Sequence, residues 1–138
     1  MVPMHLKHWL YGVYLMNARL GEVCFFSGNV RKMADFYKKL FDINNGSDDN
    51  SYQLLIDAPV RITICNDGKI KPNNNQNLSL FFAVDDVDAE YERISHTEGL
   101  RLHFTAKPTD GADGSRYMSF YDIDGNQIYF RSGGTSEA

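Results

Sequence analysis

The stretch NVRKMADFYKKLFDI, residues 29–43, carries the clearest periodic pattern of the chain. Asn29 suits a helix N-cap, because its side chain can accept a hydrogen bond from a backbone N–H of the first turn. Lys38 and Lys39 come near the end, where cations favour the negative pole of a helix. The apolar residues recur at helical spacing and form one stripe: Val30, Met33, Ala34, Tyr37, Leu40 and Phe41. The stretch therefore predicts an amphipathic helix with one buried face.

The order of elements around this helix occurs twice in the chain. Residues 21–27 are short, apolar and β-prone, so a strand is expected before the helix. A second strand-like run at 78–84 leads into a second helical pattern, and its Asp86 lies 57 positions after Asn29. Asp86 is again a favourable N-cap, and we expect Gly99 to end this second helix as its C′ residue. The chain thus repeats strand, cap and helix in one register.

The segments after each helix predict the remaining strands. Apolar or alternating runs indicate them at 51–56, 60–65, 100–105, 116–121 and 127–131, with a short additional strand considered near 69–70. Loops rich in Asn, Gly and Asp separate these runs, and 71–77 is interpreted as the linker between the halves. The elements predict an α+β fold of two tandem β-α-β-β-β modules, at about 20–70 and 78–131. Neither module is long enough to be stable alone, so we expect them to share a core.

Length and composition are those of one globular domain, with 138 residues of which 43% are hydrophobic. The net charge of −4 disfavours nucleic acid as a partner, because phosphate binding needs a basic field. Cys24 and Cys65 form no CxxC motif, and the four histidines show no metal-binding spacing. We interpret the cysteines as two reduced, mostly buried thiols of a cytoplasmic protein.

The N-terminal segment has two competing interpretations. Its uncharged run at 9–16 is too short to span a bilayer, and no small-residue cleavage site follows, so no membrane partner is expected. Residues 1–15 are either an amphipathic helix that packs on the body or on a partner subunit, or a disordered extension before a natural start at Met16. The domain itself is predicted to cover 16–138.

Three stretches together resemble motifs of the vicinal oxygen chelate superfamily, the group of glyoxalase I, bleomycin-resistance proteins and extradiol dioxygenases. They are NVRKMADFYKKLFDI at 29–43 for its first helix, VDDVDAEYERI at 84–94 for its second helix, and DIDGNQIYF at 122–130 for its closing hairpin. The resemblance implies that each module curls a mixed sheet into a half-barrel around a concave site for a metal or a small ligand. It also implies a homodimer with sites built from both subunits.

The positions that hold the metal in metal-dependent members are altered in this chain. Those members place a His on the first strand, a His on the first strand of the second half and a Glu on the last strand; the matching residues here are Glu22, Ser79 and Tyr129. Neutral Ser and Tyr are poor ligands for divalent iron, manganese or zinc, and one carboxylate does not supply about three protein donors. We therefore expect no metal and no other cofactor, with a divalent metal on Glu22 as the alternative.

Strand alternation assigns the walls of the expected concavity. The candidate ligand-binding residues are Glu22, Phe26, Arg61, Ser79, Phe81, Tyr129 and Arg131. Others expected on the same faces are Cys24, Thr63 and Gln127, with Tyr52 and His103 as additional candidates. A buried Glu22 would serve as a general base with Tyr129 as a proton donor, and these two are the catalytic candidates. In the competing interpretation Glu22 only forms a structural ion pair with Arg61 or Arg131.

Three functional hypotheses remain open at this point, and whether the protein is an enzyme is one of the open questions. The first is a metal-independent protein of the resistance or sequestration type that binds a small organic molecule in a dimeric cavity. The second is a lyase-, isomerase- or dioxygenase-like enzyme with an atypical metal site that uses Glu22. The third is a non-catalytic scaffold or regulatory module whose cavity is filled by its own side chains.

Overall fold

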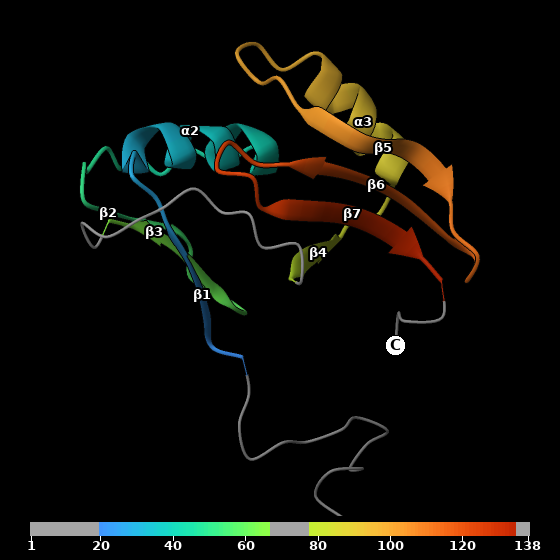
Figure 1. The fold of residues 1–138 in the computed structure, drawn as a ribbon, viewed down its shortest axis with the longest axis horizontal. Helices are drawn as coiled ribbons and strands as arrows, with labels where there is room; N and C mark the ends of the chain where they lie inside the picture. Colours follow the sequence, from blue (N-terminus) through green and yellow to red (C-terminus); the bar gives the residue numbers. More distant parts are fainter. Residues whose placement is uncertain (1–19, 67–77, 135–138) are drawn as a thin grey trace, which may run out of the picture.

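Two open mixed sheets and two helices make up the part of the chain that the computed structural model describes, residues 20–66 and 78–134. The first sheet has the order β1-β3-β2, with β1 (Glu22–Phe26), β2 (Tyr52–Ile56) and β3 (Arg61–Cys65). The second has the order β4-β7-β6-β5, with β4 (Ser79–Ala83), β5 (His103–Asp110), β6 (Ser115–Tyr121) and β7 (Gln127–Gly133). The helices are α2 (Val30–Phe41) and α3 (Val87–Ser95). The predicted α+β class with two tandem modules is confirmed (Figure 1).

Both helices begin at the predicted caps. The Asn29 side chain accepts a 3.1 Å hydrogen bond from Lys32 N, and the Asp86 side chain accepts one of the same length from Ala89 N. These bonds satisfy one of the backbone N–H groups that have no partner within each helix. The repeat seen in the sequence is therefore a repeat of structure, with the same cap position at the start of both helices.

The second helix ends earlier than Gly99, so the predicted C′ role of Gly99 is wrong. α3 stops at Ser95, and Gly99 lies beyond it in a turn, with φ of 78°. The Thr97 hydroxyl donates a 2.9 Å bond to Arg93 O, while the Thr97 N–H goes to Ile94 O at 3.1 Å. The side chain thus takes the carbonyl that a continuing helix would have used, which tightens and ends the last turn.

The two modules differ in the segment that follows the helix. In the second module this segment is β5, the edge strand, whereas in the first module residues 43–50 form a loop without a strand. Gly46 N donates to Asn44 Oδ1 and Ser47 N donates to Asn45 Oδ1, at 3.2 and 3.0 Å. Such side-chain acceptors compete with strand pairing. The strand considered near 69–70 and the linker at 71–77 lie outside the described residues.

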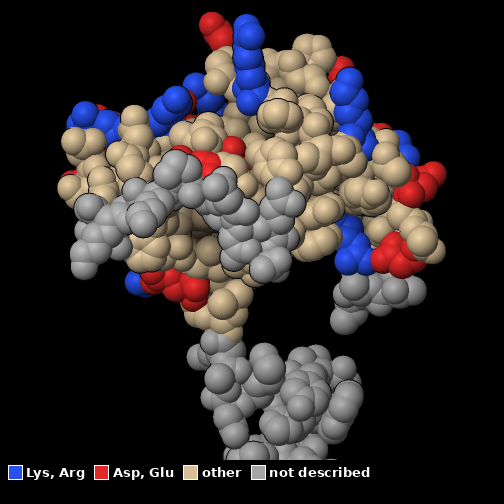
Figure 2. Space-filling model, in the orientation of Figure 1, with Lys and Arg blue, Asp and Glu red and all other residues tan. Residues whose placement is uncertain are grey.

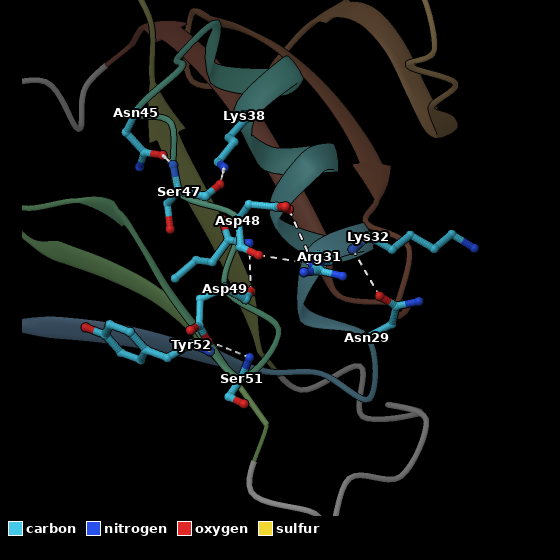
Figure 3. Close-up of polar contacts among 11 residues, drawn as sticks. Asn29, Arg31, Lys32, Lys38, Asn45, Ser47, Asp48, Asp49, Ser51 and Tyr52 are labelled. Carbon is cyan, nitrogen blue, oxygen red and sulfur yellow. Dashed lines mark hydrogen bonds and ion pairs between the residues drawn. The ribbon is translucent and has the colours of Figure 1, made fainter.

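The loop of the first module is fastened to α2 by two basic side chains. Figure 3 shows Arg31 and Lys38 reaching from the helix to the loop, where they donate to the carbonyl oxygens of Asp48 and Ser47 at 3.0 and 2.5 Å. Asp49 Oδ1 accepts a 2.7 Å hydrogen bond from Ser51 N, just before the start of β2. The sequence NNGSDDN therefore builds an ordered connection that replaces an edge strand.

A single hydrophobic core lies between the helices and the sheets, as expected from two modules that are too short to fold alone. Its two halves meet where Phe41 of α2 packs edge-on against Phe82 of β4, with ring centroids 5.0 Å apart. Arg93 of α3 adds a polar link, because its Nη2 donates a 2.6 Å bond to Leu40 O at the end of α2. In Figure 1, β1 and β3 lie below α2, and β4 and β7 lie lower and to its right.

The described surface carries both signs of charge. Figure 2 shows Lys and Arg side chains interspersed with Asp and Glu around the edge of the visible face, while its described centre is largely uncharged. Within the described residues, no helix is both long and apolar enough to cross a bilayer.

Candidate functional site

The faces of the two sheets that point away from the helices carry exposed aromatic side chains. Phe26 on β1, Tyr52 on β2 and Phe81 on β4 are 51%, 48% and 57% exposed. Their strand neighbours Phe25 and Gln53 are buried, which is the alternation expected of strands with one face on the core. The structure therefore places Phe26 and Phe81 on the faces that strand alternation assigned to a concavity.

The second sheet forms a hollow of about 280 Å³ on this face. It is lined by Phe81, Gly111, Asp113, Ser115, Tyr117, Tyr129 and Arg131. Phe81 and Tyr129 are partners in the β4–β7 ladder, and their rings stack with centroids 4.2 Å apart and planes 8° apart. Tyr117 of β6 lies next to Tyr129 at 6.1 Å. One side of the hollow is thus aromatic, with the two stacked rings of Phe81 and Tyr129 and the tilted ring of Tyr117 beside them.

The other side of the hollow is charged. Arg131, in register with Tyr117 and two residues after Tyr129, forms an ion pair with Asp113 in the β5–β6 hairpin. Asp113 Oδ1 also accepts from Ser115 Oγ and Ser115 N, at 2.5 and 3.0 Å. The bonds from Ser115, together with the positive charge of Arg131, hold the pKa of Asp113 below its usual value. The carboxylate is therefore ionised at neutral pH and fixes the guanidinium at the rim of the aromatic platform.

Glu22 has a different environment from the one expected. It is exposed, and its Oε2 accepts a 3.1 Å hydrogen bond from Thr63 Oγ1 across the β1–β3 ladder. Arg61 is bound to Asp57 at 3.0 Å, and Arg131 is bound to Asp113. Arg61 thus pairs with Asp57 of the β2–β3 loop and Arg131 with Asp113 of the β5–β6 hairpin, and the described ion pairs include none between Glu22 and either arginine. The burial that a general base at Glu22 requires is also not present.

The family follows from a comparison of the sequence with family models. Residues 19–130 match the model described as Glyoxalase/Bleomycin resistance protein/Dioxygenase superfamily, which covers well over half of the chain. The chain belongs to this superfamily. The resemblance carried by the two helix motifs and the closing hairpin is confirmed. No curated protein matches the chain.

Solved structures agree with this assignment at the level of the fold. One is a glyoxalase/bleomycin resistance protein/dioxygenase family enzyme from Burkholderia phytofirmans PsJN, with 14% identity, 83% of this chain and 98% of that chain covered, and a TM-score of 0.67. The fosfomycin resistance protein FosX from Listeria monocytogenes has 19% identity, coverage of 88% and 98%, and a TM-score of 0.65. TioX from Micromonospora sp. ML1 has 13% identity, coverage of 83% and 98%, and a TM-score of 0.62. At these identities the likeness establishes the fold alone.

The three residues that the resemblance assigns to the superfamily's metal positions are divided between the two sheets. Tyr129 offers a phenol whose ring is stacked on Phe81. Ser79 is on β4, paired with Gln127 of β7, which precedes Tyr129 by two positions. Glu22 is on the other sheet and is hydrogen-bonded to Thr63. Among the described residues no three His, Cys, Asp or Glu side chains are grouped so that they could hold a metal ion. A donor set of two neutral hydroxyls and one carboxylate lacks the ligands that these metals require.

The structure brings together only part of the predicted site. Phe81, Tyr129 and Arg131 meet in the hollow, and Ser79 lies beside it. Glu22, Phe26 and Arg61 belong to the first sheet, where Glu22 and Arg61 are ladder partners. The residues that sequence reasoning missed are Gly111, Asp113, Ser115 and Tyr117. Alternation along β6 could have assigned Tyr117 to this face. The other three lie in a segment whose Gly and Asp residues indicate only a turn.

Proposed function

We propose that this superfamily member binds a small organic ligand in the hollow without the help of a metal. The observation that carries the proposal is the Phe81–Tyr129 ring stack, open to solvent on the Phe81 side, next to the Arg131 guanidinium. Flat apolar groups gain contact with stacked rings, and a guanidinium binds carboxylate or phosphate oxygens in a bidentate manner. The ligand class that fits is a flat, mainly apolar molecule with one anionic group.

Asp113 supports this ligand class, because it keeps Arg131 in place before the ligand arrives. Arg131 is paired with Asp113, and Asp113 is itself held by Ser115. An anionic group would join or replace the aspartate at the guanidinium, which has donors for more than one acceptor. The Arg131 side chain therefore loses its conformational entropy on folding, and ligand binding does not have to order it.

We further propose that the binding form is a homodimer. The exposed rings of Phe26, Tyr52 and Phe81 leave apolar area in water, and covering such area stabilises an assembly by roughly 25 cal/mol per Å². A second copy seated on these faces would enclose the hollow. Glu22 and Arg61 of the first sheet would then be available as polar groups of the opposite wall.

Two alternatives predict different outcomes. An enzyme with an atypical metal site at Glu22 would carry a stoichiometric divalent ion that is lost in Glu22→Gln. A scaffold with a filled cavity would have no room for a ligand, and the open volume of about 280 Å³ on the second sheet favours a binding protein over that alternative.

The experiment compares matched pairs of probes on the purified full chain. Binding of naphthoate, benzoate and their uncharged amides is followed by chemical-shift changes and by thermal stabilisation. We expect the carboxylates to bind more tightly than the amides, with both Phe81→Ala and Arg131→Gln weakening the carboxylates by roughly tenfold or more. Arg101→Gln is the matched control, since Arg101 is an exposed arginine of the α3–β5 connection.

The variants separate the parts of the proposal. Arg131→Gln should remove the preference for carboxylates and keep the binding of amides, while Phe81→Ala should weaken both. Equal affinities for carboxylates in Arg131→Gln and in the unchanged protein would reject the anion subsite. Shift changes that map to residues outside the hollow would reject the site itself. Sedimentation of the chain as a monomer at all concentrations would reject the dimer. The ligand proposal would then still be tested by the carboxylate affinities and by the location of the shift changes.

A further inference from the structure

The two cysteines of the chain, which are far apart in sequence, lie side by side on the first sheet. Cys24 is on β1 and Cys65 is on β3, and their sulfur atoms are 2.8 Å apart. Both belong to the face that points away from the helices, because Cys24 is in register with Thr63 and Cys65 follows Thr63 by two positions. Both are thiols of intermediate burial, which agrees with the expectation that they are mostly buried.

This dithiol, Cys24 with Cys65, lies at the partly exposed end of its face in the single chain. Cys65 shares a row across the sheet with Phe26 and Tyr52, each about half exposed. Thr63, by contrast, is fully buried and engaged with Glu22. The two thiols therefore lie between an inner buried hydroxyl and an outer pair of exposed aromatic rings.

We propose that Cys24 and Cys65 form a reversible dithiol–disulfide couple that is oxidised by hydroperoxides or by low-molecular-weight disulfides. With a hydroperoxide, one thiolate attacks the O–O bond and becomes a sulfenic acid while an alcohol or water leaves. The second thiol then attacks that sulfur, and water is released as the S–S bond forms. Two thiols lose two electrons and two protons, and the peroxide takes up both. Glutathione disulfide gives the same product in two exchange steps with release of two glutathione thiols.

The position of the pair gives the reaction a structural effect. In the described order β1-β3-β2, β1 is an edge strand whose ladder partner is β3. A bond between residues 41 positions apart in sequence would join the edge strand covalently to the sheet centre. Closing a loop of this length is expected to raise the Tm by on the order of 10 °C. The couple would thereby fix the strand that also carries Glu22 and Phe26. It is independent of the proposed ligand function.

The first experiment is oxidation of the reduced full chain with glutathione disulfide, followed by alkylation and intact-mass measurement. We expect a product that has lost the mass of two hydrogen atoms, resists alkylation at both cysteines and yields one peptide pair linked through Cys24 and Cys65. Because the chain has only these two cysteines, that linkage is unambiguous. A lasting glutathione adduct on the unchanged chain, a disulfide between two copies, or two thiols that stay alkylatable would each overturn the proposal.

The single variants Cys24→Ser and Cys65→Ser are the controls. Each should stop at a stable glutathione adduct, because the resolving thiol is missing, and each should lose the Tm rise on oxidation. If either serine variant does not fold, the alanine variants replace it.

The second experiment tests the proximity of the thiols without oxidation. Phenylarsine oxide bonds to two adjacent thiols through one trivalent arsenic and releases water. One arsenical per chain that blocks both cysteines from alkylation supports the pair, and one that leaves a cysteine reactive contradicts it.

Discussion

The Tyr37 hydroxyl donates a 2.5 Å hydrogen bond to the carboxylate of Asp122, which lies 85 positions later in the chain. Tyr37 belongs to α2 of the first module, and Asp122 opens the closing hairpin of the second. Asp122 Oδ1 also accepts from the backbone N–H groups of Asp124 and Asn126, both at 2.9 Å. One buried carboxylate thus shapes the turn of the DIDGN motif and holds it to the helix of the other module.

Replacement of Tyr37 by Phe should destabilise the protein at pH 7 by about 1.5–3 kcal/mol, because the phenol donates to a charged acceptor that stays buried. Burial, followed by the charge of Asp122, raises the pKa of Tyr37 well above 10. A raised pKa means that the stabilisation is complete below pH 10 and is lost as the pH rises beyond it.

The measurement is urea unfolding of the unchanged protein and of Tyr37→Phe from pH 7 to pH 11. The difference in unfolding free energy should be constant up to about pH 10 and should shrink above it. A constant difference across the whole range would contradict the inferred pKa of Tyr37.

Replacement of Arg93 by Gln should cost about 1–2 kcal/mol in unfolding free energy, because Arg93 of α3 donates to the carbonyl groups of Lys39 and Leu40 in the last turn of α2. The positive charge also stabilises the negative pole of α2. Glu90→Gln is the control, since Glu90 pairs with Arg93 but does not contact α2 through these bonds. Thermal unfolding should show a larger decrease in stability for Arg93→Gln than for Glu90→Gln. Equal decreases would assign the effect to the ion pair between Arg93 and Glu90.

Phe81 and Phe120 should respond differently to replacement by Ala. Phe120 is fully buried, so its loss should cost about 3–5 kcal/mol through the cavity that it leaves. Phe81 is more than half exposed, so its loss should cost less than about 1 kcal/mol in stability and should act on ligand binding instead. Chemical denaturation alongside probe binding checks both, and a strongly destabilised Phe81→Ala would show that this ring is structural.

Divalent metals should leave the thermal stability of the untagged protein unchanged. An ion present at 100 times its Kd would stabilise the fold by about 2.7 kcal/mol, which is readily measured. Differential scanning with Mn²⁺, Ni²⁺, Zn²⁺ and Fe²⁺, each before and after chelation, is the test. A stabilisation that disappears in Glu22→Gln would favour the atypical metal enzyme.

Local patterns were sufficient to predict most of the elements. The caps Asn29 and Asp86 and the helical stripes are visible within a single turn or two of sequence, and the structure has them where they were expected. The predicted strand at 100–105 proved to be β5, which continues to Asp110 through Pro108. An edge strand tolerates proline because its outer N–H groups need no partner, and the turn-like composition concealed this extension.

The parts that sequence could not supply depend on register between distant strands. Nothing in the spacing of Cys24 and Cys65 indicates that they touch, since the β1–β3 pairing sets their contact. The ion pair of Arg131 with Asp113 likewise needs the β5–β6 hairpin to place the carboxylate beside β7. Pairing of this kind is decided by the packed core, and single-sequence periodicity describes one element at a time.

The repeat of strand, cap and helix lets the residues of the first sheet be matched with those of the second. Cys24 is the counterpart of Phe81, and Cys65 on β3 is the counterpart of Arg131 on β7, because each pair occupies the same ladder rows. The two halves thus carry different side chains at equivalent positions, thiols in the first and an aromatic ring and a guanidinium in the second. A chimera that carried the second half's residues in both halves would present two aromatic walls and no thiols, which makes the internal duplication a natural template for engineering.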